Sequence, residues 1–203
     1  KFSYPANSIN KKKKVLFLGY NEKQTRIIDE LIKNECMVDY TNDKISDELD
    51  YDIIISFGYR HIIKKNIIKD IPCPIFNLHI SYLPYNRGSH PNFWSFYDNT
   101  PSGVTIHLVD EGIDTGPIVY QKYVKFLKSE TTFLQTYSRL IEEVEDLFLK
   151  NLNNILNNKW VPIRQIGKGS YHKKSDLPKN FSGWNSNIFD ELKRLEREGL
   201  KYD

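Results

Sequence analysis

The sequence predicts an α/β protein built on a doubly wound, mostly parallel sheet. Three observations lead to this prediction. Short runs rich in Val, Ile and Leu recur through the first half of the chain, as expected for strands buried on both faces. Stretches with apolar residues at helical spacing lie between these runs. The resulting order of strand, helix, strand, strand, helix and strand is typical of open sheets that carry helices on both faces.

Each element of the first half follows from a local pattern. The strand patterns are apolar through their middle, and two of them end at a glycine. The first helix pattern places Ile27, Ile28, Leu31 and Ile32 on one face. The predicted strands cover residues 14–19, 37–40, 52–58 and 74–79, and the predicted helices cover residues 22–34 and 60–68.

The second half changes in character. A proline-containing loop is followed by a short helix that opens with Pro91, and then by a β-branched strand. A glycine-rich turn leads into a further strand, which we expect to run antiparallel to the one before it. A long amphipathic helix follows, with Thr131 or Thr132 as its cap. These elements cover residues 82–91 (loop), 91–97 (helix), 103–109 (strand), 110–117 (turn), 118–126 (strand) and 131–157 (helix); a polar, loop-like stretch from Val161 and a helix over residues 187–198 complete the chain.

Composition narrows the class of protein. Hydrophobic residues make up 39% and charged residues 27% of the 203 residues, which predicts a folded chain with a core. The net charge of +3 is too small to indicate a nucleic-acid partner. No apolar run approaches the ~20 residues of a membrane helix. Cys36 and Cys73 have no metal-ligand spacing, so we expect free thiols in the reducing cytoplasm.

Three polar residues stand out by their positions at strand ends. Asn77 and His79 are two residues apart on one strand, so their side chains point to the same side. They lie at its carboxyl end, where open α/β sheets bind ligands. Asp114 lies in the turn between Gly112 and Gly116. Taken singly, each is also typical of a turn cap, a core histidine or an Asx turn; together they are the candidate catalytic residues.

The residues around these three carry a family resemblance. The blocks NLHISYLP (77–84) and DEGIDTGP (110–117), with Arg87-Gly88 and GVTIH (103–107) between them, resemble the formyltransferases that use 10-formyltetrahydrofolate. The resemblance covers residues 15 to about 126 and implies that family's Rossmann-like fold. It also implies a flexible tail over residues 1–12, a catalytic domain over 13–160, and a C-terminal extension over 161–203 that packs on the domain.

The resemblance assigns a role to each catalytic candidate. A substrate amine attacks the formyl carbon, and negative charge develops on the formyl oxygen. Asn77 is expected to donate its amide N–H to that oxygen. His79 is expected to stabilise it as imidazolium or to relay the amine proton, and the sequence does not choose between the two. Asp114 is expected to orient and charge-stabilise His79 and to take part in proton transfer. No metal is implied.

The resemblance also implies ligand-binding residues. The folate is expected to pack against two loops, through the residues Phe57, Tyr59, His61, Ile63, Leu108, Asp110 and Ile113. For the second substrate, Arg87 is expected to pair with a diphosphate. The remaining candidates for this substrate are Tyr82, Asn92 and Trp94; the helical spacing of Trp94 favours the core over stacking on a base or sugar.

Two further stretches of the sequence bear on the identity of the acceptor. Residues 81–96 and 169–178 resemble sugar N-formyltransferases that act on nucleotide-linked 4-amino-4,6-dideoxy sugars, with dTDP-4-amino-4,6-dideoxyglucose as the expected type, for surface polysaccharide (O-antigen) synthesis. Methionyl-tRNA formyltransferase is disfavoured because too few residues follow Asn157 for a nucleic-acid-binding domain. Glycinamide ribonucleotide formyltransferase is disfavoured because residues 19–23 hold one glycine and make a poor phosphate cradle.

Two further classes stay open. A hydrolase that removes formyl from the folate would use the same three residues with water as the acceptor. A non-catalytic scaffold would not need Asn77, His79 and Asp114 together. The expected partners are a nucleotide sugar and a folate, with no nucleic acid and no membrane. The apolar faces of residues 131–157 and 187–198 predict a homodimer.

Overall fold

Six strands form one central sheet in the computed structural model, which describes residues 12–46 and 49–199. The order across the sheet is β2-β1-β3-β4-β6-β7. The first four strands in the chain run parallel, whereas β6 is antiparallel to β4 and β7 is antiparallel to β6. The predicted α/β class and the antiparallel final strand are therefore confirmed. The bounds are β1 Lys14–Gly19, β2 Met37–Thr41, β3 Ile53–Phe57, β4 Ile75–His79, β6 Gly103–Leu108 and β7 Ile118–Tyr123.

The chain reverses direction across the sheet between β1 and β3. From β1 it moves outward to β2, and it then crosses back to β3 on the other side of β1. The connections that leave β1 and β3 therefore diverge. A crevice opens at the carboxyl ends of such strands, and ligands bind there in open α/β sheets.

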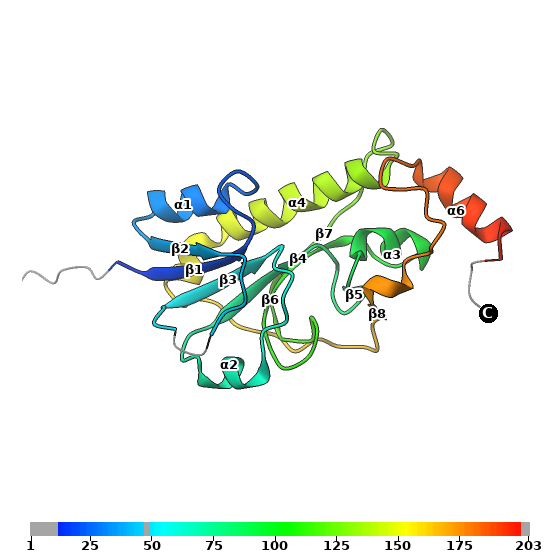
Figure 1. Ribbon diagram of the computed structural model, residues 1–203. Coiled ribbons are helices and arrows are strands. Elements are labelled where there is room, and N and C mark those ends of the chain that lie inside the picture. Colours follow the sequence, from blue (N-terminus) through cyan, green and yellow to red (C-terminus); the bar gives the residue numbers. More distant parts are fainter. Residues whose placement is uncertain (1–11, 47–48, 200–203) are drawn as a thin grey trace, which may run out of the picture.

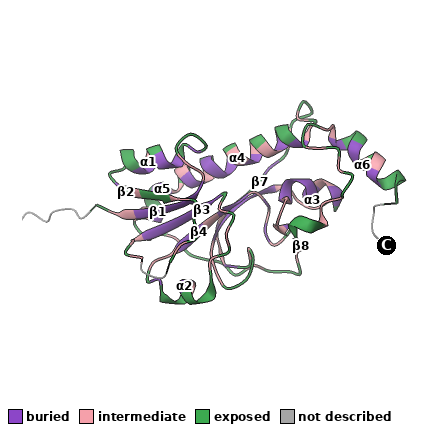
Figure 2. Ribbon diagram, viewed as in Figure 1, coloured by how far each residue is buried: buried purple, intermediate pink, exposed green. Residues whose placement is uncertain are grey.

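Helices cover both faces of the sheet (Figure 1). The helices α1 (Ile27–Lys33), α4 (Phe133–Lys150) and α5 (Leu152–Leu156) lie on one face, and α2 (Lys65–Asp70) lies on the other. Alternate residues of a strand face the helices on opposite sides of the sheet. In β1, Val15 and Phe17 belong to the core under α1 and α4, whereas Leu16 and Leu18 belong to the core over α2. The central strands β1, β3, β4 and β6 are consequently largely buried, whereas the edge strand β2 is mostly exposed (Figure 2).

The helices differ from the prediction mainly at their ends. The first begins at Ile27 rather than at residue 22, because Asn21 O accepts bonds from the N–H groups of Gln24 and Thr25 in a separate turn. The second begins at Lys65 rather than at residue 60. The long pattern of residues 131–157 is split at Asn151, whose side chain donates to Leu147 O and competes with the backbone.

The predicted cap of the long helix is confirmed. Thr132 Oγ1 accepts a hydrogen bond from Gln135 N, and the Gln135 side chain accepts in turn from Thr132 N. This capping box satisfies two backbone donors that a helix N-terminus leaves free. It fixes the start of α4 next to the aromatic cluster that joins α4 to the C-terminal part of the chain.

The C-terminal part adds structure where the sequence predicted loops. A two-stranded parallel sheet pairs β5 (Arg87–Gly88) with β8 (Tyr171–His172), and a 3-10 turn, η1 (Lys174–Asp176), follows. The helices α3 (Pro91–Tyr97) and α6 (Ile188–Arg197) meet in an aromatic cluster with Phe133. Of the predicted tail 1–12, only Lys12 is among the described residues. No helix in the described ranges is long and apolar enough to cross a membrane.

Candidate active site

A cavity of about 790 Å³ opens at the carboxyl edge of the sheet. Its walls come from the segments that follow β1, β3 and β4, from the turn between β6 and β7, and from the start of η1. The topology therefore gathers residues distant in sequence at the position where an open α/β sheet is expected to bind ligands.

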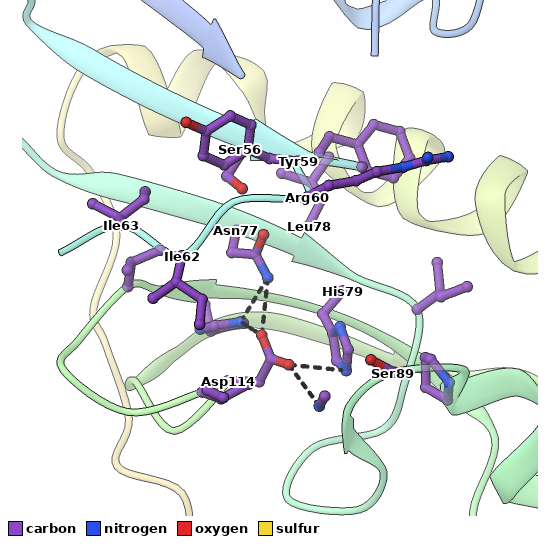
Figure 3. A pocket seen from close by; sticks show the side chains of 18 of the residues that line it. Ser56, Tyr59, Arg60, Ile62, Ile63, Asn77, Leu78, His79, Ser89 and Asp114 are labelled. Carbon is purple, nitrogen blue, oxygen red and sulfur yellow. Dashed lines mark hydrogen bonds and ion pairs between the residues drawn. The ribbon is translucent and has the colours of Figure 1, made fainter. Parts of the chain in front are cut away.

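The three predicted catalytic residues meet on one wall of this cavity (Figure 3). Asn77 Nδ2 donates to Asp114 Oδ1 at 3.2 Å, and His79 Nε2 lies 3.7 Å from Asp114 Oδ2. Gly88 N donates to the same Oδ2 at 2.8 Å. The carboxylate of Asp114 therefore lies between the two side chains of β4, as their alternation on the strand implied.

A fourth polar residue, His107, completes the group, and the sequence did not single it out as a site residue. It pairs across β4 and β6 with Asn77 in the antiparallel register, so the two side chains share one face. A register irregularity between Ile106 and His107 sets its place on β6. His107 Nε2 lies 3.1 Å from Asn77 Nδ2 and 3.4 Å from Asp114 Oδ1. Only this strand pairing reveals the neighbour, which is why the sequence pattern missed it.

The hydrogen bonds of the two histidines indicate their tautomers. His107 Nδ1 lies 2.8 Å from Leu108 O, so it carries a proton, and Nε2 accepts from the Asn77 amide. His79 Nε2 lies 3.1 Å from Asn86 O and therefore donates to it. Asn86 is fully buried, which makes its carbonyl a fixed partner. Both amide hydrogens of Asn77 consequently point at His107 and Asp114.

Asp114 is held in its ionised form. Burial by itself would raise the pKa of this carboxyl group, because a low dielectric disfavours the charge. The positive charge of His79 and His107, when these imidazoles are protonated, and the N–H of Gly88 outweigh that effect and hold the pKa of Asp114 well below its usual range. The carboxylate is therefore an electrostatic partner for cations over the whole physiological pH range.

The turn that carries Asp114 is tightly built. Asp110 Oδ1 accepts from Gly112 N at 3.0 Å and from the Thr115 hydroxyl at 2.6 Å, which closes an Asx-type turn. Asp114 itself adopts a left-handed conformation with φ 52°. A Cβ at Gly116 would lie 1.7 Å from Leu108 O, so this position accepts only glycine. The glycine-rich sequence of the turn is thus required by its packing.

Most of the residues predicted to bind folate do line the cavity. They are Phe57, Tyr59, His61, Ile63, Asp110 and Ile113. Leu108 does not, because its side chain packs against the core that lies under α1 and α4, and its neighbour Val109 lines the cavity instead. The sequence missed Tyr20 and Tyr137, whose hydroxyls lie 2.8 Å apart on the opposite wall. Those two residues are 117 positions apart, so no local pattern connects them.

Three of the residues predicted to bind the second substrate, Tyr82, Asn92 and Trp94, are not among those that line the cavity. Trp94 is only 1% exposed and stacks on His172 with ring centroids 3.9 Å apart, so it belongs to the core and offers no face to a base or sugar. Asn92 is buried and donates to Phe133 O. Tyr82 packs edge-on against Tyr123 and is not among the lining residues of the cavity.

Arg87 lies beside the cavity, with its guanidinium already engaged. Its Nε and Nη2 donate to Gln165 Oε1 at 3.1 and 2.6 Å, and the side chain lines a smaller adjoining hollow with Tyr171. The cations that line the main cavity are instead Arg60, Lys173 and Lys174. In the described part of the chain, no group of three or more His, Cys, Asp or Glu side chains is arranged to hold a metal ion.

Comparison with known proteins gives a consistent result. A family model described as formyl transferase matches residues 4–152. The dTDP-4-amino-4,6-dideoxyglucose formyltransferase of Mycobacterium bovis is 28% identical over 72% of this chain and 56% of its own length. A methionyl-tRNA formyltransferase of Clostridium botulinum is 30% identical over 70% of this chain and 46% of its own length. The chain thus spans about half the length of these curated relatives.

A solved structure resembles a larger part of the chain. The formyltransferase PseJ from Anoxybacillus kamchatkensis, in complex with UDP-4,6-dideoxy-4-formamido-L-AltNAc and tetrahydrofolate, is 38% identical. The match covers 88% of this chain and 97% of that one, with a TM-score of 0.81. The similarity therefore extends past residue 152 into the C-terminal segment.

Proposed function

The chain belongs to the formyl transferase family, and we propose that it transfers a formyl group from 10-formyltetrahydrofolate to the 4-amine of a nucleotide-linked 4-amino-4,6-dideoxy sugar. The observation that carries the proposal is the meeting of Asn77, His79 and Asp114 on the wall of one large cavity. The similarity to PseJ over nearly that protein's whole length supports the acceptor, because PseJ holds a UDP-linked 4-formamido sugar together with tetrahydrofolate.

The walls of the cavity suit a flat folate ring system. Phe57, Tyr59, Ile63, Val109 and Ile113 supply apolar and aromatic surface. We propose these residues as the folate site. The folate, bound there, supplies the activated formyl group.

The cluster of Asn77, His79, His107 and Asp114 beside the folate site would stabilise the charge that develops and transfer the proton. The sugar amine forms a bond to the formyl carbon, and the carbon–oxygen π electrons move onto oxygen. When they return, the bond to the folate nitrogen breaks, and that nitrogen takes the proton that the amine has lost. His79, with Asp114 behind it, is positioned to relay this proton or to face the developing oxyanion as imidazolium.

Asn77 would act once its hydrogen bonds rearrange. Its two amide hydrogens serve His107 Nε2 and Asp114 Oδ1. A protonated His107 would donate to Asp114 itself, since the two atoms are already 3.4 Å apart. That exchange would release one Asn77 hydrogen for the formyl oxygen. We therefore propose His107 as the residue that makes the Asn77 amide available.

The nucleotide diphosphate would lie toward Lys173 and Lys174. These exposed lysines line the cavity near His90, and burial together with the charge of Lys174 lowers the pKa of His90. Arg87 was predicted for this role, but its bonds to Gln165 make it a less suitable ligand for phosphate. Point-charge contacts from flexible lysines suit a diphosphate that must enter and leave.

A panel of acceptors tests the proposal. The purified protein is incubated with 10-formyltetrahydrofolate and, separately, with UDP-, dTDP- and GDP-linked 4-amino-4,6-dideoxy sugars, with their 3-amino isomers, with glycinamide ribonucleotide and with methionyl-tRNA. We expect a mass gain of one formyl group on a 4-amino sugar nucleotide. Formylation of only glycinamide ribonucleotide or methionyl-tRNA would contradict the proposal.

The same proposal includes the location of the enzyme, the use of its product and its oligomeric state. The free thiols of Cys36 and Cys73 fit a reducing cytoplasm, and a formylated sugar nucleotide would serve surface polysaccharide (O-antigen) synthesis. We also propose a homodimer through the apolar side chains that stay exposed near α4 and α6, Leu134 and Phe189, which are 47% and 63% exposed. Size-exclusion chromatography with light scattering would report the mass of the assembly.

A further inference from the structure

One glutamine from the C-terminal segment, Gln165, reaches the turn that carries Asp114. Its Nε2 donates to Asp114 O and to Gly116 O, each at 2.8 Å. Its Oε1 accepts the two bonds from Arg87. The side-chain amide therefore uses both of its hydrogens and both acceptor sites of its oxygen. An amide so fully engaged has one fixed orientation.

The turn needs an external support of this kind. Asp114 is a non-glycine residue with φ 52°, in the left-handed region that L-residues adopt at a steric cost. Such a conformation persists only when the surroundings hold it. Gln165 binds the carbonyl of Asp114 itself and the carbonyl two residues later, so it clamps the turn on both sides of Thr115. The position of the Asp114 carboxylate follows from that clamp.

The other end of Gln165 reaches the same carboxylate by a second route. Arg87, which donates to Gln165, directly precedes Gly88 in β5, and Gly88 N donates to Asp114 Oδ2. A closed ring therefore runs from Gln165 through Arg87 and Gly88 to the Asp114 side chain, and back through the Asp114 carbonyl. The segment bearing Gln165 is itself fastened by a bridge between Ile163 and Ile118 on β7 and by the pairing of β8 with β5.

The geometry points to Gln165 as a positioning residue for formyl transfer, through its two donated bonds to the Asp114 turn. This inference rests on the proposed function. Gln165 is not among the residues that line the cavity, so it does not touch the reactants. It acts by holding the carboxylate within reach of His79, His107 and Asn77. The C-terminal segment, which lies beyond the residues matched by the family model, is in this way part of the catalytic apparatus.

Two substitutions separate the role of the Gln165 Nε2 donors from that of its Oε1 acceptor. Gln165→Met removes all four hydrogen bonds at similar volume. Gln165→Glu keeps an acceptor for Arg87 and replaces both donors with a charge that repels the two carbonyls. We expect each variant to lower kcat by about 10- to 100-fold, the loss typical of a misplacement near 1 Å, while KM for both substrates changes much less. Wild-type kcat in Gln165→Glu would overturn the inference, because the bonds to Arg87 alone would then suffice.

A double-mutant cycle tests whether the effect passes through Asp114. In an Asp114→Asn background, Gln165→Met should cost little more, because the group that it positions has already been altered. Full additivity would overturn the inference. The matched control is Gln121→Met. Gln121 also donates from its amide, to Leu83 O and to the Thr105 hydroxyl, and neither of these partners lies in the Asp114 turn. It should leave kcat unchanged.

A readout without catalysis keeps this inference separate from the proposed function. The carboxyl ¹³C signal of Asp114 can be titrated in the wild type, in Gln165→Met and in Gln121→Met. We expect the titration midpoint to rise toward the ordinary value of about 3.9 in Gln165→Met only. If the wild type formylates no sugar and the midpoint still rises, the proposed function fails and the positioning role stands. An unchanged midpoint in Gln165→Met would overturn the positioning role.

Discussion

Asn77 on β4 and His107 on β6 form a directly opposed pair across the antiparallel part of the sheet, with Asn77 Nδ2 and His107 Nε2 3.1 Å apart. Both side chains contact Asp114, at 3.2 and 3.4 Å. The reversal of strand direction after β4 therefore has a functional consequence. It brings His107 to a site for which the sequence predicted only one histidine, His79.

The first prediction concerns His107. His107→Phe keeps an aromatic ring, although a larger one, and removes both nitrogens, so Asn77 and Asp114 each lose a partner. We expect kcat for formyl transfer to fall by about 100-fold, within the range of acid–base side chains. His107→Gln, which keeps a donor and an acceptor, should lose less. Steady-state kinetics on both variants, with circular dichroism to verify folding, make the comparison; equal activity of His107→Phe and the wild type would contradict the role proposed for His107.

The second prediction concerns acid stability. The pKa of Asp114 is depressed in the folded protein, so ionisation of this group stabilises the fold above its unfolded pKa of about 3.9. That contribution is lost progressively as the pH falls below about 4 toward the lower folded pKa. The free energy of unfolding of the wild type minus that of Asp114→Asn should shrink as the pH falls below about 4. Urea unfolding at several pH values measures it, and a difference that grows on acidification would show that the pKa is raised instead.

The third prediction concerns Trp94, which the structure assigns to the core. Trp94→Ala should lower the free energy of unfolding by about 3–5 kcal/mol, as is typical of removing a buried aromatic side chain. Trp94→Phe should cost less. The KM for the nucleotide sugar should be unchanged in Trp94→Phe, because the indole offers no face to the cavity. A large rise in that KM, with folding intact, would restore the prediction that Trp94 stacks on the substrate.

The fourth prediction concerns Gly116. In Gly116→Ala the new Cβ would meet Leu108 O at 1.7 Å, and since that atom is backbone the turn itself must move. We expect a loss of about 2 kcal/mol or more in stability, together with a fall in kcat, because Asp114 is in the same turn. Gly167→Ala is the matched control. No atom lies within 4 Å of the added carbon there, so only the cost of its positive φ applies, roughly 1 kcal/mol. Thermal unfolding and kinetics of the two variants should separate the clash from the strain.

The sequence predicted the parallel half of the fold well, because three of its four strands, β1, β3 and β4, are largely buried and are rich in apolar residues. Helix starts were less accurate. The turn at Asn21 uses the same residue types as a first helical turn, and only its backbone bonds tell the two apart. The break at Asn151 depends on a side chain that competes locally with the backbone, and the apolar stripe continues across it.

The residues of the site likewise divide into those that a local sequence pattern predicts and those that it does not. Asn77 and His79 share a strand, so simple alternation places them on one side, and Asp114 lies in a turn that leads back to them. His107 and Gln165 reach the site through strand register and a distant connection, and neither leaves a local pattern. For Trp94 a local pattern exists but does not decide the role. An aromatic residue at helical spacing has the same pattern whether it contacts the core or a ligand.

The most direct test of the central claim is a single-turnover experiment with enzyme in excess over 10-formyltetrahydrofolate. Tetrahydrofolate formation is followed with and without a UDP- or dTDP-linked 4-amino-4,6-dideoxy sugar, for the wild type and for His79→Ala. We expect one tetrahydrofolate and one formylated sugar nucleotide per cofactor molecule in the wild type, only when the amine is present, and almost none in His79→Ala. Release of tetrahydrofolate at the same rate without the amine would identify a hydrolase and contradict formyl transfer to a sugar.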